Sequence, residues 1–114
     1  MRTLWSAVLW LTATAPAAAA VPSDLVGTWY QYGDPSLPCY ISVVYGAARY
    51  TPILTFTDPD GGSAIGAMAN ANGFAVNRPG PNGYLSGRIV GDPLRNGVIA
   101  WDTGAYWTRN PGGP

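Results

Sequence analysis

Runs of β-branched and aromatic residues alternate along this chain with turns that contain glycine. Segments such as CYISVVY, TPILTFT, YLSGRIV and GVIAWD favour strands, and no window shows a sustained helical period. Between them, dipeptides suited to turns with positive φ recur every 10 to 14 residues: Asp60-Gly61, Asn72-Gly73, Asn82-Gly83 and Asn96-Gly97. This spacing is typical of consecutive hairpins.

The turns divide the chain into eight predicted strands. They cover residues 25–32, 39–45, 51–57, 63–70, 74–77, 84–91, 98–102 and 105–109. Because tight turns make neighbours in sequence into neighbours in space, the strands predict one antiparallel sheet, and such a sheet is best protected by closing on itself. We expect an all-β fold, a small up-and-down meander barrel, with a helix only as a short turn. A β-sandwich of the same strands is the alternative.

The first 20 residues have the features of a secretory signal peptide. Arg2 gives a positive start, Leu4 to Ala13 an apolar stretch, and Ala18-Ala19-Ala20 a small-residue cleavage site. We expect cleavage near Ala20 and a secreted or periplasmic protein. The apolar stretch is shorter than the roughly 20 residues of a membrane span, so no membrane anchor is expected.

Cleavage would remove 20 of the 114 residues and leave 94, enough for one small domain. We assign residues 21–109 to the β-barrel domain and 110–114 to a flexible tail. Residues 21–114 carry five Arg and six Asp and are nearly neutral, which argues against a nucleic-acid partner. It has no Lys, Glu or His, so the usual general base and the commonest metal ligand are missing.

These absences favour a binding protein over an enzyme, with no cofactor and no metal site. An Asp-dependent hydrolase is the remaining enzymatic alternative. The segment Asp58 to Ser63 has two Asp at alternate positions before a Gly, but it lacks the later ligands of a calcium loop and is expected to form a hairpin turn.

Cys39 is the only cysteine, so the chain cannot form an internal disulfide. Two interpretations remain. The thiol is a small buried group near the start of a strand, as free cysteines often are. Alternatively, Cys39 pairs with a second chain and gives a disulfide-linked dimer.

Both ends of the barrel domain carry residues suited to closing a barrel. With an even number of strands, the end of the last strand lies beside the start of the first, which brings Arg109 near Gly27 and Trp29. This arrangement resembles the closure of the calycin group, which includes lipocalins and avidin-like proteins, where a guanidinium covers the indole face. The segments GTWY and WDTGAYWTR also resemble those of small secreted bacterial proteins of uncharacterised function.

The resemblance implies that Gly27, Trp29 and Arg109 close one end of the barrel. Residues two apart share a face of a strand, so if Trp29 points inward, Leu25 and Gln31 do as well. We expect Gly27 to make room for a large side chain, either Trp29 itself or Trp107.

Four of the six Asp are predicted to lie at the end of the barrel opposite this closure. The connections that follow odd-numbered strands all lie away from the closure, and they carry Asp34, Asp58, Asp60 and Asp102, joined only by Arg78. Four carboxylates at one mouth favour a cation, a sugar or a basic protein surface. The alternative is that Asp is simply a common turn residue.

The sequence therefore predicts recognition of a small molecule or carbohydrate at the open end, by these four Asp and by Trp101 and Trp107. Simple core filling by the two Trp is the alternative for them. A second functional hypothesis is a protein-interaction module, such as an inhibitor of a secreted hydrolase. It would dock through an outer patch of tyrosines: Tyr30, Tyr32 and Tyr40.

Overall fold

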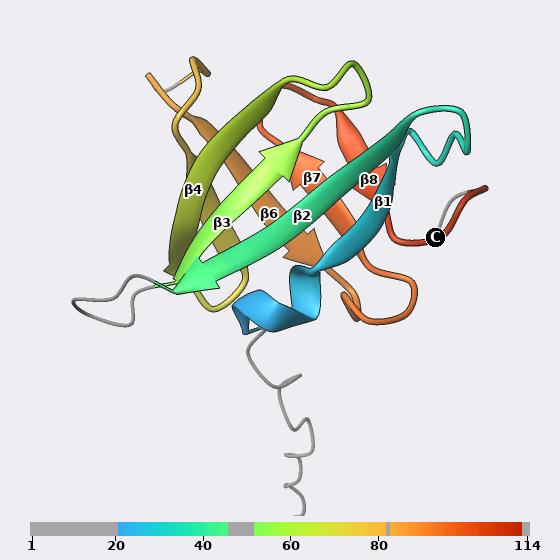
Figure 1. Ribbon diagram of the computed structural model, residues 1–114, viewed down its shortest axis with the longest axis horizontal. Coiled ribbons are helices and arrows are strands. Elements are labelled where there is room, and N and C mark those ends of the chain that lie inside the picture. The colour runs from blue at the N-terminus through green and yellow to red at the C-terminus, as the bar shows by residue number, and fades with distance from the viewer. Residues whose placement is uncertain (1–20, 46–51, 82, 113–114) are drawn as a thin grey trace, which may run out of the picture.

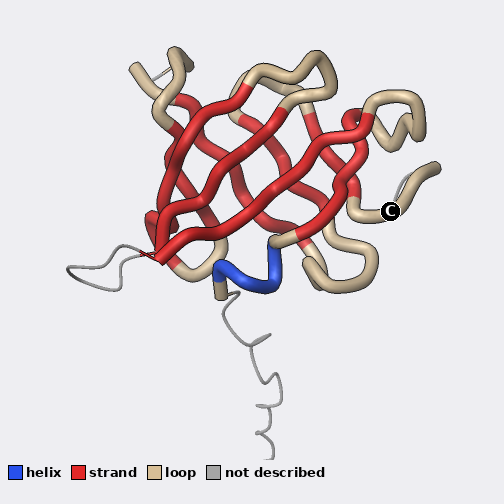
Figure 2. Tube along the Cα trace, viewed as in Figure 1, coloured by secondary structure: helices blue, strands red, loops and turns tan. Residues whose placement is uncertain are grey.

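Eight antiparallel strands form a closed barrel in the computed structural model, which describes residues 21–45, 52–81 and 83–112. Each strand pairs with its neighbours in sequence, and the last pairs with the first. Figure 1 shows the up-and-down order, and Figure 2 shows the strands wrapping around one interior. The strands are β1 (Gly27–Gln31), β2 (Pro38–Tyr45), β3 (Pro52–Thr57), β4 (Ser63–Asn70), β5 (Gly73–Val76), β6 (Leu85–Val90), β7 (Val98–Trp101) and β8 (Tyr106–Thr108).

The predicted all-β meander barrel is confirmed, and the sandwich is excluded because the sheet closes. The strand ends lie within two residues of the predicted ones, and β4 has the predicted bounds. The predicted signal peptide, residues 1–20, lies outside the described residues, as do the predicted strand start at 51 and the last two residues of the predicted tail.

A single turn of 3-10 helix, η1 (Pro22–Leu25), replaces the predicted start of the first strand. Pro22 suits the first helical position because its fixed φ matches the helix and it has no N–H to satisfy. The Val21 backbone N–H donates to the Asp24 carboxylate at 3.0 Å. Leu25 is fully buried, so it still points inward as predicted. No helix in the described part of the chain has the length and apolar character needed to cross a membrane.

The Arg109 guanidinium closes the end of the barrel beside η1. It lies 5.0 Å from the centre of the Trp29 ring and donates to the Val26 carbonyl at 2.8 Å. The Trp29 indole N–H donates to the Leu25 carbonyl at 2.8 Å. Partial burial lowers the pKa of Arg109. The group stays charged, because the ordinary pKa of a guanidinium is far above neutral pH.

The prediction for Gly27 was wrong about what fills the space beside it. A Cβ on Gly27 would lie 3.1 Å from both terminal nitrogens of Arg109, so the guanidinium and not a tryptophan ring occupies that space. The φ of Gly27 is +128°, a conformation that side chains rarely adopt. Glycine is therefore required both for the backbone and for the approach of Arg109.

Four aromatic rings meet in the barrel interior. Phe56, Phe74, Trp101 and Trp107 have neighbouring ring centres 5.0 to 6.3 Å apart, and most of these pairs meet edge to face. Gly87 of β6 makes room for them, because a Cβ there would lie 2.4 Å from Phe74 and 3.0 Å from Trp101. All four rings are buried.

We expect Gly87→Ala to lower the free energy of unfolding by about 1–3 kcal/mol, because the added methyl overpacks against the Phe74 ring. Urea denaturation measures the change. The cost should shrink in a Phe74→Leu background, which removes the clashing ring atoms. Arg88→Ala, at an exposed position on the same strand, is the control and should change stability little. Equal effects of Gly87→Ala in both backgrounds would contradict this account.

We expect Arg109→Lys to destabilise the protein by about 2 kcal/mol, because lysine lacks the planar group that bonds the Val26 carbonyl and covers Trp29. Thermal unfolding is the measurement. Arg95→Lys is the matched control, since the Arg95 side chain is 85% exposed and its pair with Asp92 spans 3.8 Å. If both variants unfold alike, the Arg109 contacts do not hold the barrel closed.

Candidate functional site

A pocket of about 520 Å³ lies at the end of the barrel opposite Arg109. Each of the four connections at this end contributes to its wall: Leu37 between β1 and β2, Asp58 between β3 and β4, Arg78 between β5 and β6, and Thr103 between β7 and β8. The up-and-down topology brings these connections together, as Figure 1 shows. This end of the barrel is therefore its open end.

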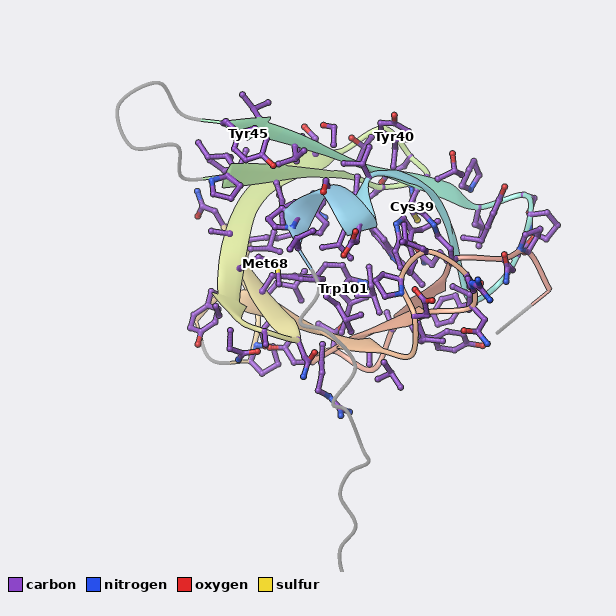
Figure 3. All side chains as sticks on the ribbon, turned by 90° about the horizontal axis from the view of Figure 1, so that it is seen from below. Cys39, Tyr40, Tyr45, Met68 and Trp101 are labelled. Atoms are coloured by element: carbon purple, nitrogen blue, oxygen red, sulfur yellow. The ribbon has the colours of Figure 1, made fainter. Side chains whose placement is uncertain are left out.

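Aromatic rings form the inner part of the pocket. Phe56, Trp101 and Trp107 line it, and all three belong to the aromatic cluster of the core. In Figure 3, which looks at the barrel from below, Trp101 lies within the ring of strands. Ala64 and Ala105 also line the pocket, and their small side chains leave space that larger residues would fill.

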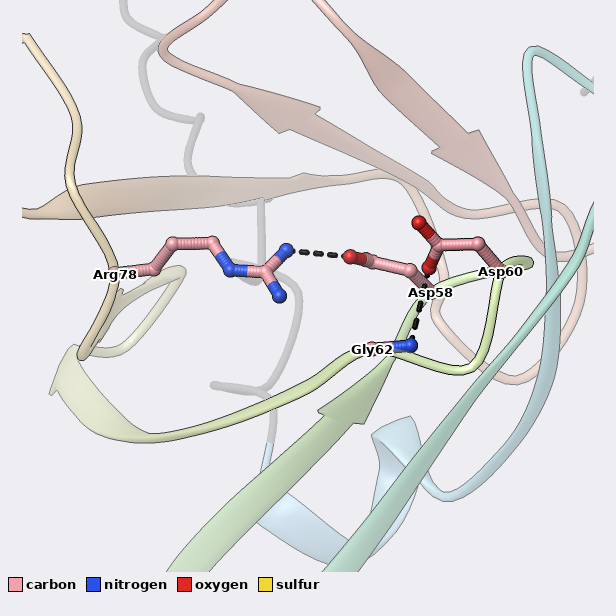
Figure 4. A network of polar contacts seen from close by, with 4 residues as sticks. All are labelled: Asp58, Asp60, Gly62 and Arg78. Carbon is pink, nitrogen blue, oxygen red and sulfur yellow. Dashed lines mark hydrogen bonds and ion pairs between the residues drawn. The ribbon is translucent and has the colours of Figure 1, made fainter.

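Charged residues form the rim of the pocket. Arg78 makes an ion pair with Asp58, and the Gly62 backbone N–H donates to the Asp60 carboxylate at 3.0 Å, as Figure 4 shows. A Cβ placed on Gly62 would lie 3.3 Å from Asp60 Oδ1, 3.4 Å from Arg78 Nη2 and 3.7 Å from Asp58 Oδ2. The three charged groups thus converge around one point beside the pocket.

The Trp101 indole leaves one hydrogen-bond donor without a partner. Its Nε1 is buried and has no acceptor among the described residues, although the residue lines the pocket. A buried donor left unsatisfied costs about 1–3 kcal/mol.

The structure separates the four predicted Asp into two groups, although all four lie in connections at the open end. Asp58 and Asp60 line the pocket together with Trp101 and Trp107. Asp34 and Asp102 are not among the lining residues, and each has a local structural role.

Asp34 Oδ1 accepts from the backbone N–H and the hydroxyl of Ser36, and these hydrogen bonds lower the pKa of its carboxyl. Asp102 Oδ2 accepts from the backbone N–H and the hydroxyl of Ser86, which ties the end of β7 to β6. Both are turn or strand-end contacts of the kind that Asp commonly makes.

Sequence reasoning did not select Phe56, Leu37 or Arg78 as site residues. Arg78 was placed at the open end, but its pairing with Asp58 depends on two connections that lie 20 residues apart. Phe56 could have been found by the same alternation that placed Trp29, because Leu54 and Phe56 share the inner face of β3. The small inward residues Ala64 and Ala105 were the available sign of unfilled space.

The two carboxylates at the pocket are not part of a larger group of metal ligands among the described residues. Among residues 21–45, 52–81 and 83–112, no three His, Cys, Asp or Glu side chains are grouped as a metal centre requires. Asp58 and Asp60 are the carboxylates at the pocket, and Asp58 already pairs with Arg78.

The outer tyrosines are arranged differently from the predicted patch. Tyr32 and Tyr40 are about half exposed, but Tyr30 is less so. The Tyr32 ring meets Tyr106 edge to face at 5.2 Å, a partner from β8 that the patch did not include. Tyr32 also has a positive φ of 55°, which ends the regular alternation of β1.

Cys39 lies on the inner face of β2 and its residue is 2% exposed. Burial, with a smaller effect from the negative charge of Asp58, raises the pKa of the thiol to about 12. The side chain would have to leave the core before it could reach a second chain. The disulfide-linked dimer stays an untested prediction.

We expect Cys39 to resist an aromatic disulfide reagent at mildly alkaline pH, because the thiolate is the reacting form and the raised pKa suppresses it. The same reagent should label one thiol per chain after denaturation in guanidinium chloride. Absorbance of the released thiolate measures both reactions. Rapid labelling of the native protein would show that the thiol is accessible and that its pKa is not raised.

No protein-family model, curated protein or solved structure matches this chain. A function must therefore be inferred from the chemistry of the chain itself.

Proposed function

We propose that this protein binds a small, largely apolar molecule in the pocket at the open end of the barrel. The pocket itself is the observation that carries the proposal. Its volume of about 520 Å³ lies within the range of small-molecule sites, and its wall is mostly apolar with a few polar groups at the rim. A small barrel is usually filled by its own side chains, so unfilled space of this size favours a ligand.

An apolar ligand fits this site better than a carbohydrate. Trp101 and Trp107 are only 7% and 4% exposed, and their rings meet edge to face at 5.1 Å. They present little flat aromatic face on which a sugar ring could stack.

Binding without turnover agrees with the state of the candidate reactive groups. Arg78 engages the Asp58 carboxylate, and burial keeps the Cys39 thiol protonated. We place this binding function in a secreted or periplasmic protein of the calycin type. Support for that comes from the signal-like residues 1–20 and from the Arg109 contact with Trp29.

A pocket-filling substitution tests the proposal. The neutral fluorophore N-phenyl-1-naphthylamine should bind the unsubstituted protein saturably with a rise in its emission. In Ala64→Phe the new ring would occupy the pocket, and we expect affinity to fall about ten-fold or more, a loss of about 1.4 kcal/mol. Ala67→Phe is the matched control, because Ala67 lies on the outer face of the same strand.

Thermal unfolding of both variants shows whether each keeps its fold. The proposal fails if the unsubstituted protein shows no saturable binding, or if Ala67→Phe weakens binding as much as Ala64→Phe. In that case the exposed Tyr32 and Tyr106 pair would favour the alternative, an interaction with another protein such as a secreted hydrolase.

A further inference from the structure

The open end of the barrel carries an excess of negative charge. Its four connections hold four Asp and one Arg, which leaves a formal charge of −3. The net charge of the pocket rim is also negative, since two carboxylates, Asp58 and Asp60, face the guanidinium of Arg78. Apolar walls beside such charges concentrate the field and increase its effect on a ligand.

Among the described residues that line the pocket, the one cation is already engaged. Arg78 pairs with Asp58, and its side chain is 37% exposed in that pair. Asp60, by contrast, forms no ion pair within the part of the chain that the structure describes. An anionic ligand would meet two carboxylates beside a guanidinium that already has a charged partner, whereas a cation would meet a carboxylate that forms no ion pair of its own.

The inner pocket favours an apolar group. Phe56, Trp101 and Trp107 line the pocket below the rim. Their rings provide an apolar surface for a flat hydrocarbon group. A ligand that joins a flat ring to a cationic group would use both features at once.

We propose that the ligand is an arylalkylamine, in which an alkyl linker joins an aromatic ring to an ammonium group, with its ring among Phe56, Trp101 and Trp107 and its ammonium group beside Asp60. This inference rests on the proposed function, because it assigns the chemical class of the molecule in the same pocket. Asp60 is the residue that sets the preference for a positive charge. The Arg78–Asp58 pair holds the neighbouring carboxylate and limits the site to one cation.

Three probes with the same indole ring test the inference: tryptamine, tryptophol and indole acetate, which carry a cationic, a neutral and an anionic group. NMR titration can follow the indole N–H signals of the three Trp in residues 21–114. We expect the signals of Trp101 and Trp107 to shift, whereas that of Trp29, at the closed end, does not. Tryptamine should bind about ten-fold more tightly than tryptophol, and indole acetate most weakly. High salt should reduce the difference.

Asp60→Asn should reduce the preference for tryptamine over tryptophol to about three-fold or less. Asp34→Asn is the matched control. Both residues are exposed turn Asp that accept a backbone N–H two positions later, but Asp34 does not line the pocket. Its substitution removes the same charge and should change the preference by no more than about two-fold.

The outcomes separate the two proposals. Similar affinities for all three probes, with shifts at Trp101 and Trp107, would overturn the arylalkylamine inference and leave the binding function standing. An equal loss of preference in Asp34→Asn and Asp60→Asn would also overturn it, because the charge of the whole end and not Asp60 would then select the cation. If no probe shifts these signals and N-phenyl-1-naphthylamine does not bind, the binding function fails as well.

Discussion

The contact between Arg109 and the first turn of the chain holds together two ends of a small sheet. Strands β1 and β8 pair over only two residues of each strand, Tyr30 with Thr108 and Gln31 with Trp107. Unpaired, these two strands would be exposed edges. The guanidinium adds a hydrogen bond to the Val26 carbonyl and a contact with Trp29 just beyond the paired residues. The interior of the barrel, and with it the pocket, depends on this closure.

The closure also explains why the two ends of the barrel differ. At the Arg109 end, Leu25 and Trp29 are fully buried and fill the interior. At the other end, the inward positions include Ala64 and Ala105, which are too small to meet across the barrel. The aromatic cluster between them forms the boundary of the filled part. One barrel thus combines a packed half that provides stability with an incompletely filled half that provides a site.

Alternation and turn chemistry were sufficient to predict the barrel, because both act over a few residues. Counting strands predicted the end of the barrel at which each connection lies. It placed Asp58 and Asp60 correctly at the open end. The same count brought Arg109 near Gly27 and Trp29, but it did not show which side chains from distant segments fill a space or form a pair. The space beside Gly27 is filled from residue 109, and the partner of Asp58 comes from 20 residues away. Asp34 and Asp102 look like site residues in the sequence, but Ser36 and Ser86 engage them.

The two ends of the described chain leave the barrel in different directions. Val21 precedes η1 at the closed end, whereas the Gly112 backbone N–H donates to the Gly33 carbonyl at 2.6 Å, beside the first connection of the open end (Figure 1). A barrel immobilised through its N-terminal side would present its mouth away from the support. One attached through the C-terminal side would have its linker next to the mouth, where a bulky fusion would compete with anything entering.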